Sequence, residues 1–106
     1  MASGTLDVFA TPAMIALIEA AASESVAPYL DEGFSTVGTH LDIAHSAASP
    51  VGIDVVCETE LVEVDRRRLV FRAVVKDAVG EIGSGTHERF IVDNAKFMAK
   101  AQSKLQ

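Results

Sequence analysis

The stretch Thr11–Leu30, TPAMIALIEAAASESVAPYL, decides the fold because it reads as one long helix that is apolar on every side. Threonine often caps a helix N-terminus and proline suits the first helical position, so Thr11 and Pro12 predict the helix start. Pro28 predicts its end, because proline breaks a helix interior. Residues 13–18 and 20–22 carry no polar side chain, so we expect other elements to enclose most of the helix.

One carboxylate, Glu19, interrupts this apolar surface. The residues three and four positions away are Ile15, Ala16, Ala22 and Ser23, so no basic side chain lies within local reach. A buried carboxylate without a partner is costly. We therefore expect Glu19 to have a partner on another element, and the identity of that partner bears directly on function.

Length and composition indicate a single globular domain spanning residues 1–106. The 106 residues are 49% hydrophobic and the net charge is −6, which argues against non-specific nucleic-acid binding. The single Cys57 excludes an internal disulfide and fits a reducing compartment. No apolar run is long enough to span a bilayer and no signal-peptide pattern is present, so we expect no membrane partner and a cytoplasmic location.

The sequence after residue 35 changes to the period-two alternation that is typical of β-strands. Four strands are predicted, over residues 36–46, Ile53–Val64, Leu69–Lys76 and Glu81–Val92. One face of the first strand is mostly apolar and carries Val37, Thr39, Leu41, Ile43 and His45. A short helix, Asn94–Lys104, is predicted to follow, with Asp93 as its N-cap and Phe97 as its anchor.

One enclosed helix followed by an antiparallel meander predicts an α+β fold. The sheet must curve strongly to surround the helix. Gly38, Gly83 and Gly85 lie inside predicted strands, where glycine suits bends or close backbone approach. A curved antiparallel sheet wrapped around one long central helix is the hotdog architecture.

Four ordered blocks resemble the fluoroacetyl-CoA thioesterase family of hotdog proteins. They are FATPAMIALIEAAA (9–22), TVGTHLDIAHSAASPVG (36–52), ELVEVDRRRLVF (60–71) and IGSGTHERFIV (82–92). The resemblance runs from about Leu6 to the C-terminus. It implies an acyl-CoA thioesterase that acts on short-chain acyl-CoA esters and forms a homodimer with active sites near the interface. Three His residues and Asp42 could suggest a metal site, but no HxH or HExxH spacing is present, so we expect no metal and no cofactor.

The same resemblance implies roles for individual residues. Thr11, Glu19 and His45 match the catalytic residues of the family. Gly38 and Arg89 match positions near the acyl end of the site. Side chains that are apolar or small are expected to line the acyl pocket together with Gly38, namely Met14, Ile15 and Phe34.

Thioester hydrolysis needs a nucleophile, a donor to the developing oxyanion and a proton for the leaving thiolate. Glu19 and His45 together could activate water or the Thr11 hydroxyl, or Glu19 could act directly, and the sequence does not separate these mechanisms. The oxyanion donor is expected to be the amide of Ala13 or Gly38, because Pro12 has no N–H.

Structural interpretations of the same residues remain open. Thr11 could be only an N-cap, Glu19 could form a structural ion pair with Arg89, and His45 could be a satisfied strand histidine. His40 and His87 are interpreted as structural or rim residues. The run from Arg66 to Arg68 is interpreted as a solvated hairpin tip that could also contact coenzyme A phosphates.

Two further expectations concern the whole chain. Members of the family carry a longer N-terminal segment with a strand and aromatic lid residues, so we expect this hotdog to lack the usual N-terminal strand and to have an open acyl end. The alternative function is a non-catalytic hotdog module that binds acyl-CoA or another small ligand.

Overall fold

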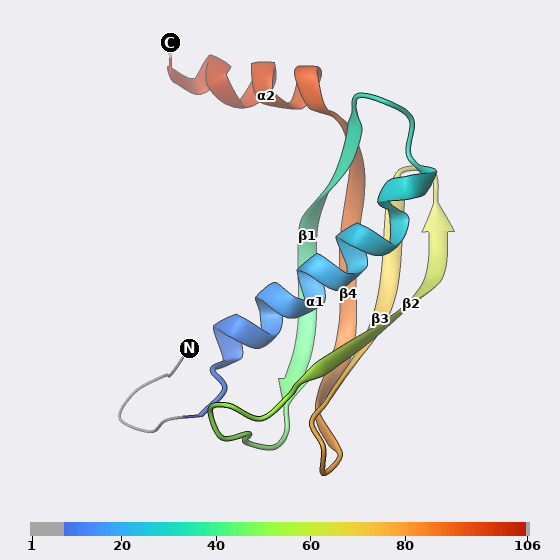
Figure 1. The fold of residues 1–106 in the computed structure, drawn as a ribbon. Coiled ribbons are helices and arrows are strands. Elements are labelled where there is room, and N and C mark those ends of the chain that lie inside the picture. Colours follow the sequence, from blue (N-terminus) through green and yellow to red (C-terminus); the bar gives the residue numbers. More distant parts are fainter. Residues whose placement is uncertain (1–7, 106) are drawn as a thin grey trace.

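A computed structural model describes residues 8–105 and contains a long helix, a curved four-stranded antiparallel sheet and a short C-terminal helix (Figure 1). The helix α1 lies across the concave face of the sheet. In chain order, the elements are α1 (Thr11–Val26), η1 (Ala27–Tyr29), β1 (Phe34–His45), β2 (Val56–Asp65), β3 (Arg68–Lys76), β4 (Glu81–Asp93), α2 (Asn94–Gln102) and η2 (Ser103–Leu105). The predicted α+β class is confirmed.

The strand order is β1-β4-β3-β2, and all three neighbouring pairs are antiparallel. Only β2, β3 and β4 form a meander, so the expectation of a meander through all four strands is wrong. β1 is joined to β2 by residues 46–55, a connection that contains Pro50 and Gly52 and is longer than a tight hairpin turn. The strand beside β1 is β4, so the first and last strands lie side by side.

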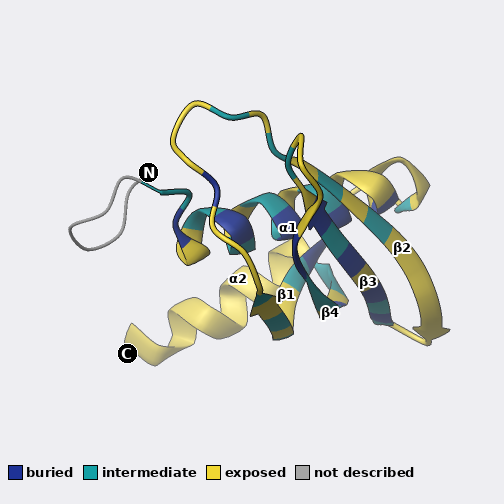
Figure 2. Cartoon of the chain, turned by 90° about the horizontal axis from the view of Figure 1, so that it is seen from below, coloured by how far each residue is buried: buried dark blue, intermediate teal, exposed yellow. Residues whose placement is uncertain are grey.

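Helix α1 buries one stripe of residues spaced four apart: Met14, Ile18, Ala22 and Val26. This stripe packs against β3 and Ile82 of β4. Figure 2 shows the buried residues gathered where α1 meets the sheet. Ala16 and Ala20 on another side of the helix are exposed, so the expected enclosure on most sides is wrong for the single chain.

The start of α1 differs from its prediction in a way that matters for the site. Ala10 is the N-cap residue and Thr11 is the first helical residue. The Thr11 side chain therefore does not cap the helix. Its hydroxyl is left to bond elsewhere, because a capping role requires the residue to precede the first helical turn.

A β-bulge interrupts β1, where the register with β4 shifts between Gly38 and His40. The extra residue, Thr39, reverses the alternation of side chains along the strand. Before the bulge, Thr36 and Gly38 meet partners on the helix side of the sheet, and after it Leu41 packs with the core. The predicted apolar face that joined Val37 and Thr39 to Leu41 is therefore wrong.

Close backbone approach explains two glycines of β4, as predicted. A Cβ atom at Gly85 would lie 1.9 Å from the carbonyl oxygen of Asp42 in β1. A Cβ atom at Gly83 would lie 2.6 Å from the Met14 sulfur. The sheet can curve tightly under α1 because these positions carry no side chain.

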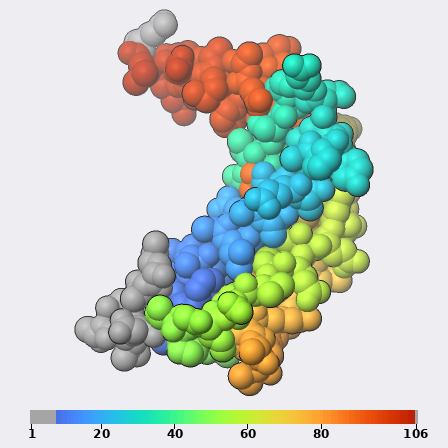
Figure 3. Space-filling model, viewed as in Figure 1, coloured from blue at the N-terminus to red at the C-terminus, as the bar shows by residue number. Residues whose placement is uncertain are grey.

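Helix α2 begins as predicted, since the Asp93 side chain accepts a hydrogen bond from the Lys96 amide at 3.1 Å. Its expected anchor is wrong: the Phe97 side chain is 43% exposed, because α2 leaves the end of β4 and points away from the sheet. The space-filling view shows a crescent with a hollow between α2 and the first half of α1 (Figure 3).

Candidate functional site

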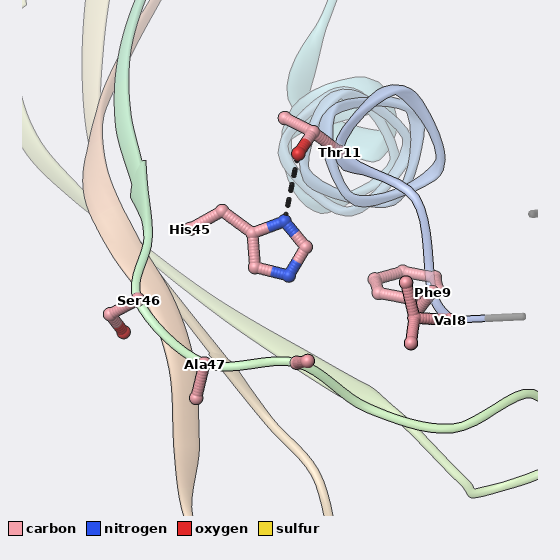
Figure 4. Close-up of a pocket in the computed structure, with 7 residues that line it drawn as sticks. Val8, Phe9, Thr11, His45, Ser46 and Ala47 are labelled. Carbon is pink, nitrogen blue, oxygen red and sulfur yellow. Dashed lines mark hydrogen bonds between the residues drawn. The ribbon is translucent and has the colours of Figure 1, made fainter. Parts of the chain in front are cut away.

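Thr11 and His45 meet at one end of the sheet, although they lie far apart in the sequence. The Thr11 hydroxyl oxygen is 2.9 Å from Nδ1 of His45. Thr11 opens α1 and His45 closes β1, so the packing of the helix across the sheet creates this contact (Figure 4). A hydroxyl held by an imidazole nitrogen is the arrangement of a nucleophile and its base.

The pair lines a pocket of about 280 Å³. The other lining residues come from the chain entering α1 and from the connection after β1: Val8, Phe9, Ser46, Ala47 and Ala48. The pocket wall is therefore built from small side chains and one aromatic ring.

The second nitrogen of His45 has no hydrogen-bond partner among residues 8–105, although it is buried. The Phe9 ring lies edge-on to the imidazole, with 6.4 Å between ring centroids. If Nδ1 accepts the Thr11 proton, a neutral ring carries its own proton on Nε2. In the tautomer that lets His45 act as a base, the N–H of Nε2 therefore has no acceptor within residues 8–105. In a catalytic triad, this is the N–H that a third residue would bind to orient the histidine.

Ser49 fixes the connection that forms the pocket wall. Its side chain is fully buried and donates a hydrogen bond to Asp77 Oδ2 at 2.8 Å, while its carbonyl accepts one from the Phe9 amide at 2.8 Å. The Ser49 hydroxyl and the amides of Val79 and Gly80 hold the pKa of the Asp77 carboxyl below its usual value. This network ties three separate segments together next to the pocket.

Glu19 belongs to a second polar cluster, nearer the middle of the sheet. Its partner is Arg89 of β4, with 3.5 Å between Nη1 and Oε2, which confirms that Glu19 has a partner on another element. Arg89 is buried, and Thr36 takes two of its bonds: Nε donates to the hydroxyl at 2.8 Å and Nη2 to the carbonyl at 2.9 Å. The Glu19 side chain is 41% exposed and faces the surface from this cluster.

His87 completes the second cluster and was missed as a functional candidate. It is fully buried and stacks on Phe71, so its interpretation as a possible rim residue is wrong. Nε2 lies 3.2 Å from Arg89 Nη1, and Nδ1 lies 2.9 Å from the His40 carbonyl oxygen. Because Arg89 can only donate, Nε2 accepts and Nδ1 donates, which fixes a neutral tautomer. The alternation that places His87 on the same face as Arg89 was the available signal.

Because Gly38 has no side chain, it leaves space for the Glu19, His87 and Arg89 side chains of this cluster. A Cβ atom there would lie 2.7 Å from Glu19 Oε2, 3.2 Å from His87 Cε1 and 3.3 Å from Arg89 Nη1. The structure therefore brings three of the predicted site residues together: Glu19, Gly38 and Arg89.

Thr11 and Glu19 are two helical turns apart, which corresponds to about 12 Å along the helix axis. Within residues 8–105 no hydrogen bond or ion pair connects Glu19 to Thr11 or His45. The three residues predicted as one catalytic set therefore occupy two clusters in a single chain.

The other predicted site residues are not among those that line the Thr11–His45 pocket. Met14 is fully buried under Gly83, and Phe34 lies at the opposite end of β1, under the Arg67 guanidinium. Ile15 is half-buried on α1. The amide of Ala13, one of the two expected oxyanion donors, already donates to the Ala10 carbonyl at 3.0 Å.

Across residues 8–105, no three His, Cys, Asp or Glu side chains are grouped so that they could hold a metal ion. No helix in that part of the chain has the length and apolarity to cross a membrane.

Comparison with known proteins identifies the family. Residues 1–95 match the family described as fluoroacetyl-CoA-specific thioesterase. The chain belongs to this family. The resemblance seen in the sequence is thereby confirmed, together with the assignment of the chain as a thioester hydrolase.

Individual members and neighbours agree with this assignment. The fluoroacetyl-CoA thioesterase of Streptantibioticus cattleyicolor is 45% identical over 98 residues, which cover 92% of this chain and 70% of that protein. A solved variant of fluoroacetyl-CoA thioesterase, in complex with fluoroacetate and CoA, superposes with a TM-score of 0.93 at 42% identity and covers 98% of this chain and 81% of that one.

The hotdog fold is confirmed by a more distant neighbour. A hot-dog-like protein from Thermanaerovibrio acidaminovorans has a TM-score of 0.90 at 23% identity, over 94% of this chain and 74% of that one. At this identity the likeness concerns the fold alone.

The Ser49 network generates a prediction about stability. Because folding lowers the pKa of Asp77, its contribution is present above the unfolded pKa of about 3.9 and is lost as pH falls through the folded value. Ser49→Ala removes the largest cause of this shift. We expect the variant to be less stable than the wild type at pH 7, and the gap to shrink below about pH 4.

Urea denaturation of both proteins across this pH range measures the gap. Ser46→Ala is a matched control, because Ser46 is exposed and its hydroxyl makes no hydrogen bond within residues 8–105. A gap that stays constant from pH 7 to pH 3 would show that Asp77 does not depend on Ser49.

Proposed function

We propose that the Thr11–His45 pair is the reacting centre at which this thioesterase hydrolyses short-chain acyl-CoA esters. The hydrogen bond of 2.9 Å between the two side chains, in a pocket formed by small residues, is the observation that supports it best. The relatives named for fluoroacetyl-CoA and solved with CoA support the substrate class. The pocket volume of about 280 Å³ suits a short acyl group.

The proposed first step is acyl transfer to Thr11. The hydroxyl oxygen attacks the thioester carbonyl, His45 Nδ1 takes the hydroxyl proton, and the carbon–sulfur bond breaks as the carbon–oxygen bond forms. The proton on His45 then passes to the leaving thiolate. In the second step, His45 accepts a proton from water as the water oxygen attacks the acyl-threonine carbonyl. The bond from the acyl carbon to the Thr11 oxygen breaks, His45 returns the proton to that oxygen, and the free acid leaves.

Glu19 is the proposed second base, and Arg89 is its positioning residue. The buried guanidinium is held by Thr36 and His87, so it presents Nη1 to the carboxylate in one fixed direction. Gly38 keeps the space beside this carboxylate open. Gly38 and Arg89 remain proposed substrate-binding residues beside Glu19. Met14 and Phe34 do not fit the expected acyl lining, because Met14 is fully buried in the core and Phe34 lies at the far end of β1 from His45. Ile15, which is half-buried on α1, remains a proposed lining residue.

The protein is proposed to act as a homodimer. Strand β1 has β4 on one edge and no described strand on the other, and free strand edges favour pairing with a second chain. The exposed small residues Ala16 and Ala20 of α1 face outward, and the hollow of the crescent opens on the same side as β1 (Figure 3). Two antiparallel β1 strands related by a two-fold axis would continue the sheet across both protomers.

Thiol release from a panel of acyl-CoA esters tests the proposed activity. We expect turnover of several short acyl-CoAs, and less than a hundredfold preference for fluoroacetyl-CoA over acetyl-CoA, because a pocket wall of mostly small side chains separates near-isosteres poorly. Binding of acyl-CoA by calorimetry without thiol release would instead identify a non-catalytic binding module. Thr11→Val keeps the shape of the side chain and is expected to abolish release.

Glu19→Gln is expected to lower kcat/KM for acyl-CoA at least a hundredfold, or about 2.7 kcal/mol of transition-state stabilisation. The change is nearly isosteric and removes the titrating group, so the fold should persist. Glu24→Gln on the exposed side of α1 is the matched control and should stay within twofold. Activity of the Glu19 variant within threefold of the wild type would assign the Glu19–Arg89 pair a purely structural role.

The dimer is expected to dominate at micromolar concentration, as measured by light scattering. Placing a charge on the exposed helix surface, with Ala20→Glu, should shift the mass toward the monomer, because a charge is costly in an apolar interface. A wild-type mass equal to one chain at that concentration would refute the proposed assembly.

A further inference from the structure

The distribution of basic side chains in this acidic protein is uneven. The chain has nine Lys and Arg residues and a net charge of −6. Four of the nine form ion pairs: Arg68, Arg72, Lys76 and Arg89. The other five have no carboxylate within ion-pair distance among residues 8–105, and they are Arg66, Arg67, Lys96, Lys100 and Lys104.

Most of these unpaired cations gather around α2. Lys96, Lys100 and Lys104 follow one another at intervals of four residues, which places them on one side of the C-terminal helical segment. Two adjoining pockets of about 210 and 320 Å³ lie there and share Phe97 and Lys100. We call this surface the basic groove and define it by Arg67, Lys96, Phe97, Lys100 and Lys104.

We propose that the basic groove binds the phosphates of the coenzyme A part of the substrate, with the adenine against the Phe97 ring. The proposal rests on the acyl-CoA thioesterase function above and names a second recognition site for the same substrate. Coenzyme A carries a diphosphate and a 3′-phosphate, which need several cations, and the groove supplies four. Phe97 is an exposed aromatic ring between them, and adenine stacks on such rings.

Two contacts show that the groove is positioned rather than loose. The Arg67 guanidinium lies 5.8 Å from the centre of the Phe34 ring, which holds it at the pocket wall. Asp93, the carboxylate that also lines the pocket, accepts the Lys96 amide as the N-cap of α2. Neither contact involves a lysine ammonium group, and among residues 8–105 no carboxylate lies within ion-pair distance of Lys96, Lys100 or Lys104.

The position of the basic groove indicates that it serves the reacting centre of the other protomer in the proposed dimer. The groove lies at the Phe34 end of β1, whereas His45 lies at the other end, and a 12-residue strand is about 37 Å long. This span exceeds the reach of an extended coenzyme A molecule. In an antiparallel pair of β1 strands, the His45 end of one protomer comes beside the Phe34 end of the other, so each groove serves the partner's site.

Figure 1 supports this arrangement. Helix α2 and the first turn of α1 both project past β1 on the same side of the molecule, at opposite ends of the strand. A two-fold rotation about an axis beside β1 would therefore bring α2 of one protomer toward the first turn of α1 in its partner.

The first test compares a full substrate with a truncated one in the intact protein. The double variant Lys96→Gln/Lys100→Gln should raise KM for acetyl-CoA at least tenfold, with kcat unchanged, and leave KM for acetyl-pantetheine unchanged because that substrate has no nucleotide. The matched control Arg72→Gln/Lys76→Gln removes two charges on β3 and should stay within twofold. An unchanged KM for acetyl-CoA, or an equal rise for both substrates, would overturn the proposal.

A binding measurement separates the groove from the catalytic proposal. Adenosine 3′,5′-bisphosphate should bind the wild type in calorimetry, weaken with added salt, and bind the lysine double variant at least tenfold more weakly. If the bisphosphate binds in this salt-sensitive, lysine-dependent way but no thioester is hydrolysed, the proposed phosphate site is supported and the proposed thioesterase function is refuted. Lysine-dependent binding to phosphatidylserine vesicles without bisphosphate binding would overturn the groove in favour of a lipid surface.

Mixed dimers test which site each groove serves. Thr11→Val chains lack the nucleophile but keep the groove, and Lys96→Gln/Lys100→Gln chains keep the nucleophile. Co-expression should restore a component with low KM that neither variant shows alone, because the intact groove serves the partner's intact Thr11. Only the high-KM component would appear if each groove served its own chain, and this result would overturn the cross-subunit assignment.

Discussion

The buried guanidinium of Arg89 is the constraint on which much of this structure depends. A buried charge is costly unless its donors are paired, and here Thr36, His87 and Glu19 accept four hydrogen bonds from Arg89. These partners come from β1, β4 and α1, so one side chain links the helix to both strands beneath it. His87 must be neutral to accept from Arg89, and its own N–H is taken by the His40 carbonyl.

The bulge at Thr39 and the glycine at position 38 follow from the same constraint. Without the extra residue, the alternation that turns Leu41 toward the core would turn Thr36 and Gly38 away from the helix. With it, Thr36 reaches Arg89 and Gly38 leaves room for the Glu19 carboxylate. A bulge beside a functional cluster is a common way to re-aim side chains.

Local patterns were sufficient to predict the elements, and tertiary contacts decided the rest. The start of α1 to within one residue, the alternation of β3, the glycine contacts of β4 and the Asp93 cap follow from residue chemistry within a few positions. The bulge could not be predicted, because it occurs in the pairing of β1 with β4, and the order of the strands along the chain does not show that these two strands are neighbours. Two interpretations of the Thr11 hydroxyl were open, as an N-cap or as part of a site with His45, and the observed contact is the one with His45.

The proposed dimer accounts for several features that a single chain leaves incomplete. Within residues 8–105, Ala16 and Ala20 of the apolar helix are exposed, one edge of β1 has no strand beside it, and the partly exposed Phe97 lies beside lysines that form no ion pair. In a monomer, each of these three features would need its own explanation. A second copy placed along β1 would cover the helix, pair the edge and carry its own Thr11–His45 pocket toward the basic groove. Because a two-fold axis repeats every contact, this one surface would complete both reacting centres at once.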